Sequence, residues 1–145
     1  MPVLSKLDIC QLIPHAGSMC LLDSVQEWGP SNITCLSSTH HDLQNPLRRG
    51  GHLEAICGLE YAAQAMAVHV RLVASPHCSE PQIGYIGAVR DCRLHVACLD
   101  EVMSVLEVKA VKLFAQDQSV IYELKVSAEG SELLSGRASL FLKKD

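Results

Sequence analysis

The stretch LEAICGLEYAAQAMAVHVRLVA, residues 53–74, decides the fold of this chain. It is apolar over most of its length, contains no proline and is rich in alanine, leucine and methionine, which are strong helix formers. A helix of this length spans about 30 Å, which is long enough to cross a bilayer. Glu54, Glu60 and Arg71 interrupt it, and a charge near the bilayer centre costs roughly 2.5–3.5 kcal/mol. The sequence therefore predicts a long helix buried in a globular core, and no membrane span.

The segments on either side of this helix carry the alternating apolar and polar pattern of strands. Upstream, we expect a short helix and two strands, over 5–13, 20–28 and 33–39. Downstream, we expect four antiparallel strands, over 82–90, 102–114, 120–127 and 133–143. A sheet with one apolar face packed on one apolar helix is an α+β architecture. No linker or repeat divides it, so residues 1–145 are predicted to form a single domain.

Composition excludes several broad classes of protein. The chain has 145 residues, the usual size of one domain, and its hydrophobic content of 48% excludes intrinsic disorder. Its net charge is −4, so the chain lacks the positive electrostatic field that attracts nucleic-acid backbones. Aromatic residues make up only 4%, too few for a base-stacking surface. We therefore expect no nucleic-acid partner.

The cysteines indicate the compartment. There are seven, an odd number, none in a C-x-x-C pair, and no secretory signal opens the sequence. Scattered thiols of this kind are typical of a reducing compartment, so we expect free cysteines and a cytoplasmic protein. The cysteines are too dispersed for a zinc motif, and the His40-His41 pair is interpreted as part of a polar loop. The sequence thus predicts no metal site.

A set of short motifs in a fixed order links the chain to a known family. They are Ile13-Pro14-His15, Leu21-Leu22-Asp23, Asn45-Pro46, Gly51, Leu59-Glu60-Tyr61-Ala62-Ala63-Gln64 and Gly84-Tyr85-Ile86-Gly87. In this order they resemble the hotdog-fold 3-hydroxyacyl-(acyl carrier protein) dehydratases, and most of all the branch found in aryl-polyene biosynthetic clusters. The resemblance covers nearly the whole chain.

The resemblance implies a fold, a reaction and partners. The fold is the hotdog fold, an antiparallel sheet wrapped around one helix, normally dimeric, with active sites at the protomer interface. The reaction is a lyase reaction that removes water from a 3-hydroxyacyl thioester in fatty-acid or polyene-type lipid biosynthesis. The substrate is carried on the phosphopantetheine of acyl carrier protein, and no further cofactor is implied.

One departure from the family pattern bears on catalysis. Better-known members carry their catalytic histidine in a Gly-His-Phe-Pro-Gly stretch, and here Asn45-Pro46-Leu47 fills that slot. The Pro-Gly pair expected near the helix start is replaced by Glu54-Ala55. Three functions remain open. The chain is a dehydratase, or a non-catalytic subunit that completes the site of a partner dehydratase, or an acyl thioesterase, since hotdog thioesterases also use a carboxylate on the central helix. We expect a dimer, either a homodimer or a heterodimer with another hotdog dehydratase.

Dehydration of a 3-hydroxyacyl thioester needs a base for the C2 proton, an acid for the C3 hydroxyl and a donor for the carbonyl. We expect Glu60, a carboxyl group on an apolar helix, and His15, held next to a proline, to be the catalytic groups. Gln64 lies one turn beyond Glu60 on the same helix face, where it either orients Glu60 or the substrate, or hydrogen bonds to the sheet.

Several further residues are candidates for binding the substrate or its carrier. Gly50, Gly51 and His52 precede the helix, where backbone N–H groups can polarise a carbonyl; a plain turn is the alternative. The local basic clusters are Arg48 with Arg49 and Arg90 with Arg93. Arginines suit the acidic carrier protein and the phosphate of its prosthetic group, whereas the alternative is a solvated basic surface.

Overall fold

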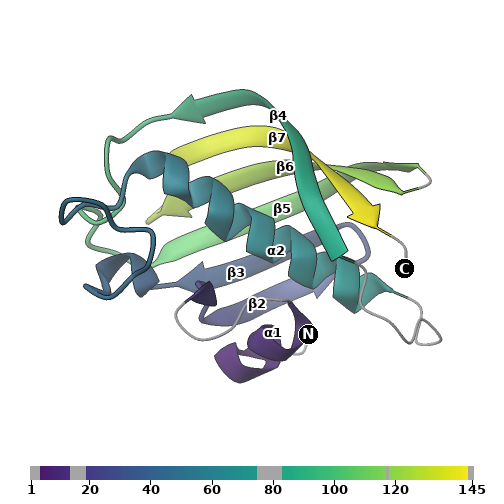
Figure 1. Cartoon of the computed structure of the whole chain (residues 1–145), viewed down its shortest axis with the longest axis horizontal. Coiled ribbons are helices and arrows are strands. Elements are labelled where there is room, and N and C mark those ends of the chain that lie inside the picture. Colours follow the sequence, from purple (N-terminus) through teal and green to yellow (C-terminus); the bar gives the residue numbers. More distant parts are fainter. Residues whose placement is uncertain (1–3, 14–18, 75–82, 117, 144–145) are drawn as a thin grey trace.

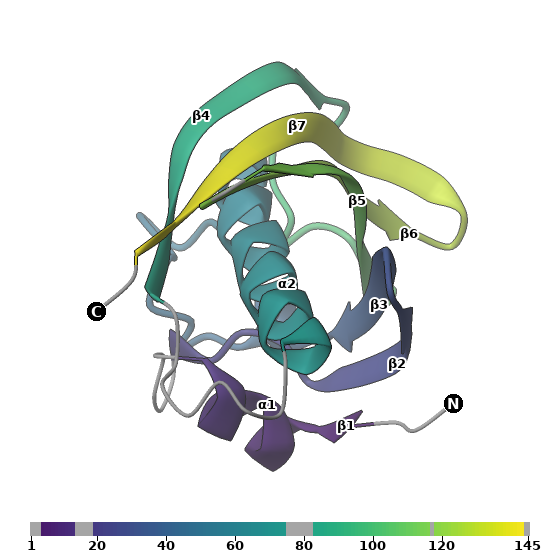
Figure 2. The ribbon, with the colours of Figure 1, turned by 90° about the vertical axis from the view of Figure 1, so that its right-hand side faces the viewer.

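Helix α2, Gly58–Val73, lies in the hollow of a curved sheet (Figures 1 and 2). The computed structural model describes residues 4–13, 19–74, 83–116 and 118–143. Its elements follow the order β1 (Leu4–Ser5), α1 (Lys6–Leu12), β2 (Ser24–Gly29), β3 (Asn32–Ser37), η2 (Thr39–His41), η3 (Ala55–Cys57), α2, β4 (Ile83–Leu94), β5 (Leu106–Gln116), β6 (Ser119–Ala128) and β7 (Ser131–Lys143). The predicted α+β arrangement of a sheet around one long helix is confirmed.

The seven strands that the structure describes join one antiparallel sheet in the order β1-β2-β3-β5-β6-β7-β4. Strands β5, β6 and β7 are neighbours in sequence and in space. Strand β4 precedes them in the chain but lies at the far edge, where β7 is its one partner among the described residues. The chain therefore leaves one edge of the sheet occupied by a 12-residue strand.

The core forms between α2 and the concave face of the sheet. Tyr61, Ala65 and Met66 of α2 are fully buried, and alternate residues of β5 and β6 point toward them, namely Leu106, Val108, Ala110, Tyr122, Leu124 and Val126. Each large apolar side chain buried in this way contributes about 1.5–3 kcal/mol. None of the helices that the structure describes is long and apolar enough to span a membrane.

The helix begins later than the sequence predicts. Residues 53–55 are extended and pair with residues 97–99: the Leu99 N–H donates to the Leu53 carbonyl at 2.7 Å, and the Ala55 N–H to the Ala97 carbonyl at 3.0 Å. The 3-10 turn η3 follows, and α2 starts only at Gly58. The predicted start at residue 53 is wrong because the apolar run also includes the buried residues of this short extended segment. The N-cap residue of α2, Cys57, makes no side-chain capping hydrogen bond, so the sequence has no capping signal for the first turn of the helix.

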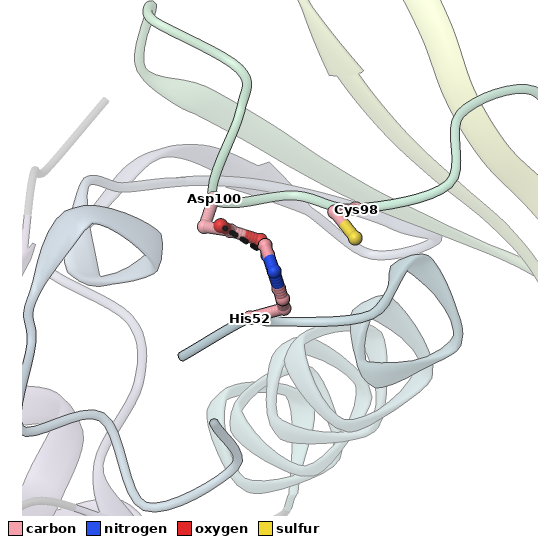
Figure 3. Close-up of side chains that lie close together, drawn as sticks. All are labelled: His52, Cys98 and Asp100. Carbon is pink, nitrogen blue, oxygen red and sulfur yellow. Dashed lines mark hydrogen bonds and ion pairs between the residues drawn. The ribbon is translucent and has the colours of Figure 1, made fainter. Parts of the chain in front are cut away.

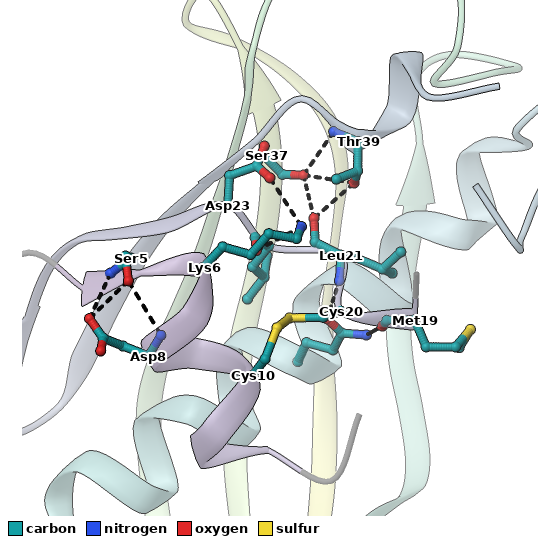
Figure 4. The surroundings of a disulfide bond; sticks show 12 residues. Ser5, Lys6, Asp8, Cys10, Met19, Cys20, Leu21, Asp23, Ser37 and Thr39 are labelled. Atoms are coloured by element: carbon teal, nitrogen blue, oxygen red, sulfur yellow. Dashed lines mark hydrogen bonds and ion pairs between the residues drawn. A yellow bond between two sulfur atoms is a disulfide. The ribbon is translucent and has the colours of Figure 1, made fainter. Parts of the chain in front are cut away.

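The expectation that all cysteines are free is also wrong. Cys10 of α1 and Cys20, just before β2, form a disulfide with a Cα–Cα distance of 6.0 Å (Figure 4). Helix α1 packs against α2 and β2, and this packing rather than a sequence motif brings the two thiols together. Four other cysteines in the described part of the chain are free: Cys35, Cys57, Cys92 and Cys98.

One buried polar contact fixes the middle of α2. His69 is fully buried, with Nδ1 at 2.6 Å from the Tyr122 hydroxyl and Nε2 at 2.8 Å from the Gly29 carbonyl oxygen. A carbonyl only accepts, so Nε2 carries the proton and Nδ1 accepts from Tyr122. Desolvation lowers the pKa of His69, in keeping with a neutral ring that ties α2 to β2 and β6.

Candidate functional site

Glu60 and Gln64 lie one turn apart on α2 and touch each other. Glu60 is half-buried in the first turn of the helix, and Gln64 is fully buried. The Gln64 Oε1 atom accepts the Leu21 N–H at 2.9 Å, which fixes the orientation of the amide. Its Nε2 group then donates to the Met19 carbonyl at 2.6 Å and lies 3.5 Å from Glu60 Oε1. Gln64 thus contacts Glu60 and hydrogen bonds to the segment before β2 rather than to a strand of the sheet, and its role in orienting Glu60 remains a prediction.

The segment that Gln64 binds is held from its other side. The Leu21 carbonyl accepts from Ser37 Oγ at 2.6 Å and from Thr39 Oγ1 at 2.8 Å (Figure 4). Thr39 Oγ1 is also 2.8 Å from the hydroxyl of buried Tyr61. The backbone on which Gln64 depends is therefore anchored in a buried polar network between α2 and β3.

The Leu-Leu-Asp motif has a structural counterpart in this network. Leu21 and Leu22 are fully buried, and Asp23 accepts from the Ser38 N–H at 2.7 Å and lies 3.2 Å from Lys6 Nζ. Sequence reasoning did not identify Ser37, Thr39 or Tyr61 as members. The available signal was Tyr61, since a tyrosine buried on an apolar helix needs a hydrogen-bond partner for its hydroxyl.

Asn45, which the family resemblance places in the slot of the catalytic histidine, is part of the same network. Its Nδ2 group donates to the Thr39 carbonyl at 2.9 Å and to the Tyr61 hydroxyl at 3.0 Å. Its Oδ1 atom accepts the Leu47 N–H at 2.9 Å. Both amide protons are therefore used within the protein. Asn45 braces the loop, and its side chain has no group that takes up a proton.

The Gly50–Gly51 pair forms the tip of a two-residue turn. Both residues have positive φ, +61° and +82°, and the flanking Arg49 and His52 exchange two backbone hydrogen bonds of 2.8 and 3.1 Å. The tip is exposed, and η3 lies between it and α2. The glycine N–H groups therefore do not belong to the first turn of α2, contrary to expectation. A role in substrate binding remains a prediction.

The four predicted arginines fall into two different environments. The Arg48 guanidinium donates to the carbonyls of His40, Asp42 and Gly51 at 2.8–3.0 Å, so it braces the loop before α2, beside exposed Arg49. Arg90 and Arg93 are exposed on the edge strand β4. Arg90 lies opposite exposed Arg137 of β7, which sequence reasoning did not single out. Carrier-protein docking at these residues remains a prediction.

His15 lies outside the described residues, so its predicted catalytic role is not tested here. His52 is 60% exposed and contacts Asp100 at 3.4 Å. Glu60 is thus the predicted catalytic group that the structure describes on α2, where its carboxylate contacts Gln64, and its catalytic role remains a prediction.

Comparisons with known proteins bear on the family and the fold. The sequence matches the ApeP-like family, described as ApeP dehydratase, over residues 7–145. The structure is similar to the dehydratase heterocomplex ApeI:P from Xenorhabdus doucetiae, with a TM-score of 0.83 and 22% identity over 94% of this chain and 91% of that chain. No curated protein sequence matches the chain.

More distant structures share the fold. AziG from S. sahachiroi has a TM-score of 0.65 and 12% identity over 92% of this chain and 99% of that one. A hypothetical thioesterase from Streptococcus pneumoniae, solved with coenzyme A, has a TM-score of 0.60 and 10% identity, covering 83% and 85% of the two chains. Together these similarities confirm the predicted hotdog fold.

Proposed function

Because this chain belongs to the ApeP-like dehydratase family, we propose that it is one subunit of a dehydratase acting on 3-hydroxyacyl chains bound to acyl carrier protein. We further propose that it acts together with a second hotdog dehydratase. The observation that carries this is the pairing of Glu60, positioned by Gln64, with a fully hydrogen-bonded Asn45 where better-known dehydratases have their histidine. The chain thus offers one half of a catalytic pair.

In the proposed reaction, Glu60 acts as the acid at C3. A base removes the C2 proton, the C3–O bond breaks, and the Glu60 proton joins the departing hydroxyl to give water and a 2,3-unsaturated thioester. Gln64 holds the carboxylate through its Nε2 group. The base is a histidine, either His15 of this chain or one from the partner subunit.

The unpaired edge of β4 supports the proposed partner. A long edge strand exposes a row of backbone N–H and C=O groups that can pair with another strand. Within the described part of the chain, strand β4 pairs on one side only, and exposed apolar side chains lie on it and on β7, with Val89 36%, Leu94 47% and Phe141 38% exposed. We propose that the partner's edge strand continues the sheet here. Such a pairing would give a complex of two chains, and the similar structure ApeI:P is a heterocomplex.

The remaining parts of the proposal concern the carrier and the compartment. Arg90 and Arg93 on the exposed surface of β4 suit an acidic carrier protein and the phosphate of its phosphopantetheine. We propose the cytoplasm as the compartment, in keeping with the proposed carrier-bound substrate; the Cys10–Cys20 disulfide removes the cysteine pattern as support for it. The chain itself needs no cofactor in this scheme.

The test is an assay of the co-expressed complex with a carrier-bound 3-hydroxyacyl substrate. Glu60→Gln keeps the side-chain volume and removes the proton, so we expect turnover to fall at least about tenfold, or roughly 1.4 kcal/mol of barrier, with folding unchanged. A smaller loss would exclude Glu60 as the acid. Release of free carrier thiol without unsaturated product would identify a thioesterase. Sedimentation that finds a stable monomer at micromolar concentration, even with a second hotdog dehydratase present, would argue against a subunit that works in a pair.

A further inference from the structure

A short two-stranded ribbon, which precedes η3 and α2 in the chain, carries four side chains of the types that bind metal ions. Residues 52–55 run antiparallel to residues 97–100, with Glu54 opposite Cys98. In that register His52 lies opposite Asp100. Since side chains alternate along extended backbone, these four residues share one face of the ribbon. Leu53 and Leu99, on the opposite face, are fully buried, which confirms the alternation.

Three of the four residues place their ligand atoms close together (Figure 3). One ligand atom each from His52, Cys98 and Asp100 lies within 4.8 Å of the other two. His52 Nδ1 is 3.4 Å from Asp100 Oδ2, while Asp100 Oδ1 accepts the Leu53 N–H at 2.8 Å. The backbone bond holds the Asp100 carboxylate in place and leaves Oδ2 directed toward the cluster.

From this geometry we propose that His52, Cys98 and Asp100 form a binding site for a divalent transition-metal ion of the zinc class. A nitrogen, a sulfur and an oxygen donor are the ligand types that Zn²⁺ takes in proteins. Tetrahedral Zn²⁺ with bonds of 2.0–2.3 Å places its ligand atoms roughly 3.3–3.8 Å apart, so small side-chain movements close the site. The fourth position falls to Glu54, on the same face, or to water.

The charges around the cluster favour a cation. The carboxylates of Asp100, Glu101 and Glu54 lie close enough to Cys98 to place negative charge around its sulfur. A nucleophilic cysteine needs the opposite, an electropositive environment, so a Cys-His-Asp triad for covalent chemistry is the weaker interpretation. A bound ion would join the segment before η3 to the segment before β5, and so fix the backbone that leads into α2.

The experiment is a titration of the chelator-treated, metal-free full chain with Co²⁺ alone. Thiolate-to-cobalt charge-transfer absorption reports the sulfur ligand directly. We expect one Co²⁺ per chain, displaced by Zn²⁺, with affinity weakened at least about tenfold in Cys98→Ser, His52→Ala and Asp100→Asn. Asn at position 100 keeps an oxygen for the Leu53 N–H, so this variant is expected to stay folded.

Cys92→Ser is the matched control, because Cys92 is also a free cysteine and lies exposed on β4, away from the cluster. Its cobalt spectrum and affinity are expected to equal those of the unmodified chain. Absence of a thiolate band in the unmodified chain would overturn the proposal. So would a band that survives both Cys98→Ser and His52→Ala, since it would place the ion elsewhere. Circular dichroism of each variant establishes that lost binding does not reflect lost folding.

Discussion

Replacement of Gln64 by leucine tests whether this residue holds the site together. Leucine has a similar size but no hydrogen-bonding group, so the buried Leu21 N–H loses its acceptor and the Met19 carbonyl its donor. A buried polar group left without a partner costs about 1–3 kcal/mol. Leu21 is fully buried and Met19 only partly, so we expect the free energy of unfolding to fall by about 2–4 kcal/mol.

The stability assay is urea unfolding at fixed protein concentration, because association with a partner shifts apparent stability. Gln11→Leu is the control: Gln11 is an exposed helical glutamine on α1, and its replacement is expected to change stability by less than about 0.5 kcal/mol. If Gln64→Leu is as stable as Gln11→Leu, the hydrogen bonds to Leu21 and Met19 do not anchor the segment.

The same variant also separates positioning from mere packing. With the complex assembled and folded at low temperature, loss of the contact to Glu60 is expected to lower kcat with little change in KM. A kcat equal to that of the unmodified complex would show that Gln64 supports the fold alone and does not position Glu60.

Three further predictions concern the buried polar contacts and the disulfide. Reduction of Cys10–Cys20, or Cys10→Ser, frees a short loop closed over a separation of 10 residues, and urea unfolding with and without dithiothreitol should show a loss of about 2–3 kcal/mol. An equal midpoint in both conditions would contradict this. Tyr122→Phe leaves His69 Nδ1 without its donor and should cost about 1–3 kcal/mol in the same assay, whereas an unchanged midpoint would remove the tyrosine from that role. Burial lowers the pKa of His40 and His69 below the usual 6.5, so the unfolded chain binds more protons just below that pH. The free energy of unfolding therefore keeps the full contribution of both histidines above about pH 6.5 and falls as the pH drops below it, by at most about 1.4 kcal/mol per pH unit for each histidine. A free energy of unfolding that rises on acidification would contradict this prediction.

The elements with strong periodicity could be predicted from sequence. Strands β6 and β7 begin and end within about two residues of the predicted ranges, because their apolar positions face α2 without interruption. Strand β4 extends further than predicted. Its charged stretch Arg90–Arg93 continues the ladder through an irregularity at Asp91, whose φ is +55°. A bulge at an exposed edge leaves no apolar alternation for a sequence pattern to detect.

Contacts between different elements of the fold could not be predicted from the sequence. The position of β4 beside β7, the pairing of Cys10 with Cys20 and the meeting of His52 with Cys98 all depend on how the sheet closes around α2. Local periodicity reports which face of an element is buried but not which element lies next to it. The spacing of the cysteines along the chain likewise does not show that Cys98 lies beside His52 and Asp100 in the fold.

Asn45 is suited to brace its loop rather than to exchange protons. An asparagine can replace a histidine as a brace, since its amide both donates and accepts, and here its two protons and its oxygen are all used by Thr39, Tyr61 and Leu47. Such an amide has no proton left to donate to a thioester carbonyl and no site to take one from C2. The loop thus retains its shape without its chemistry, and the base in the proposed reaction must come from His15 or from the partner subunit. Glu60 and Gln64, anchored through Leu21, are then the part of the catalytic pair that this chain supplies.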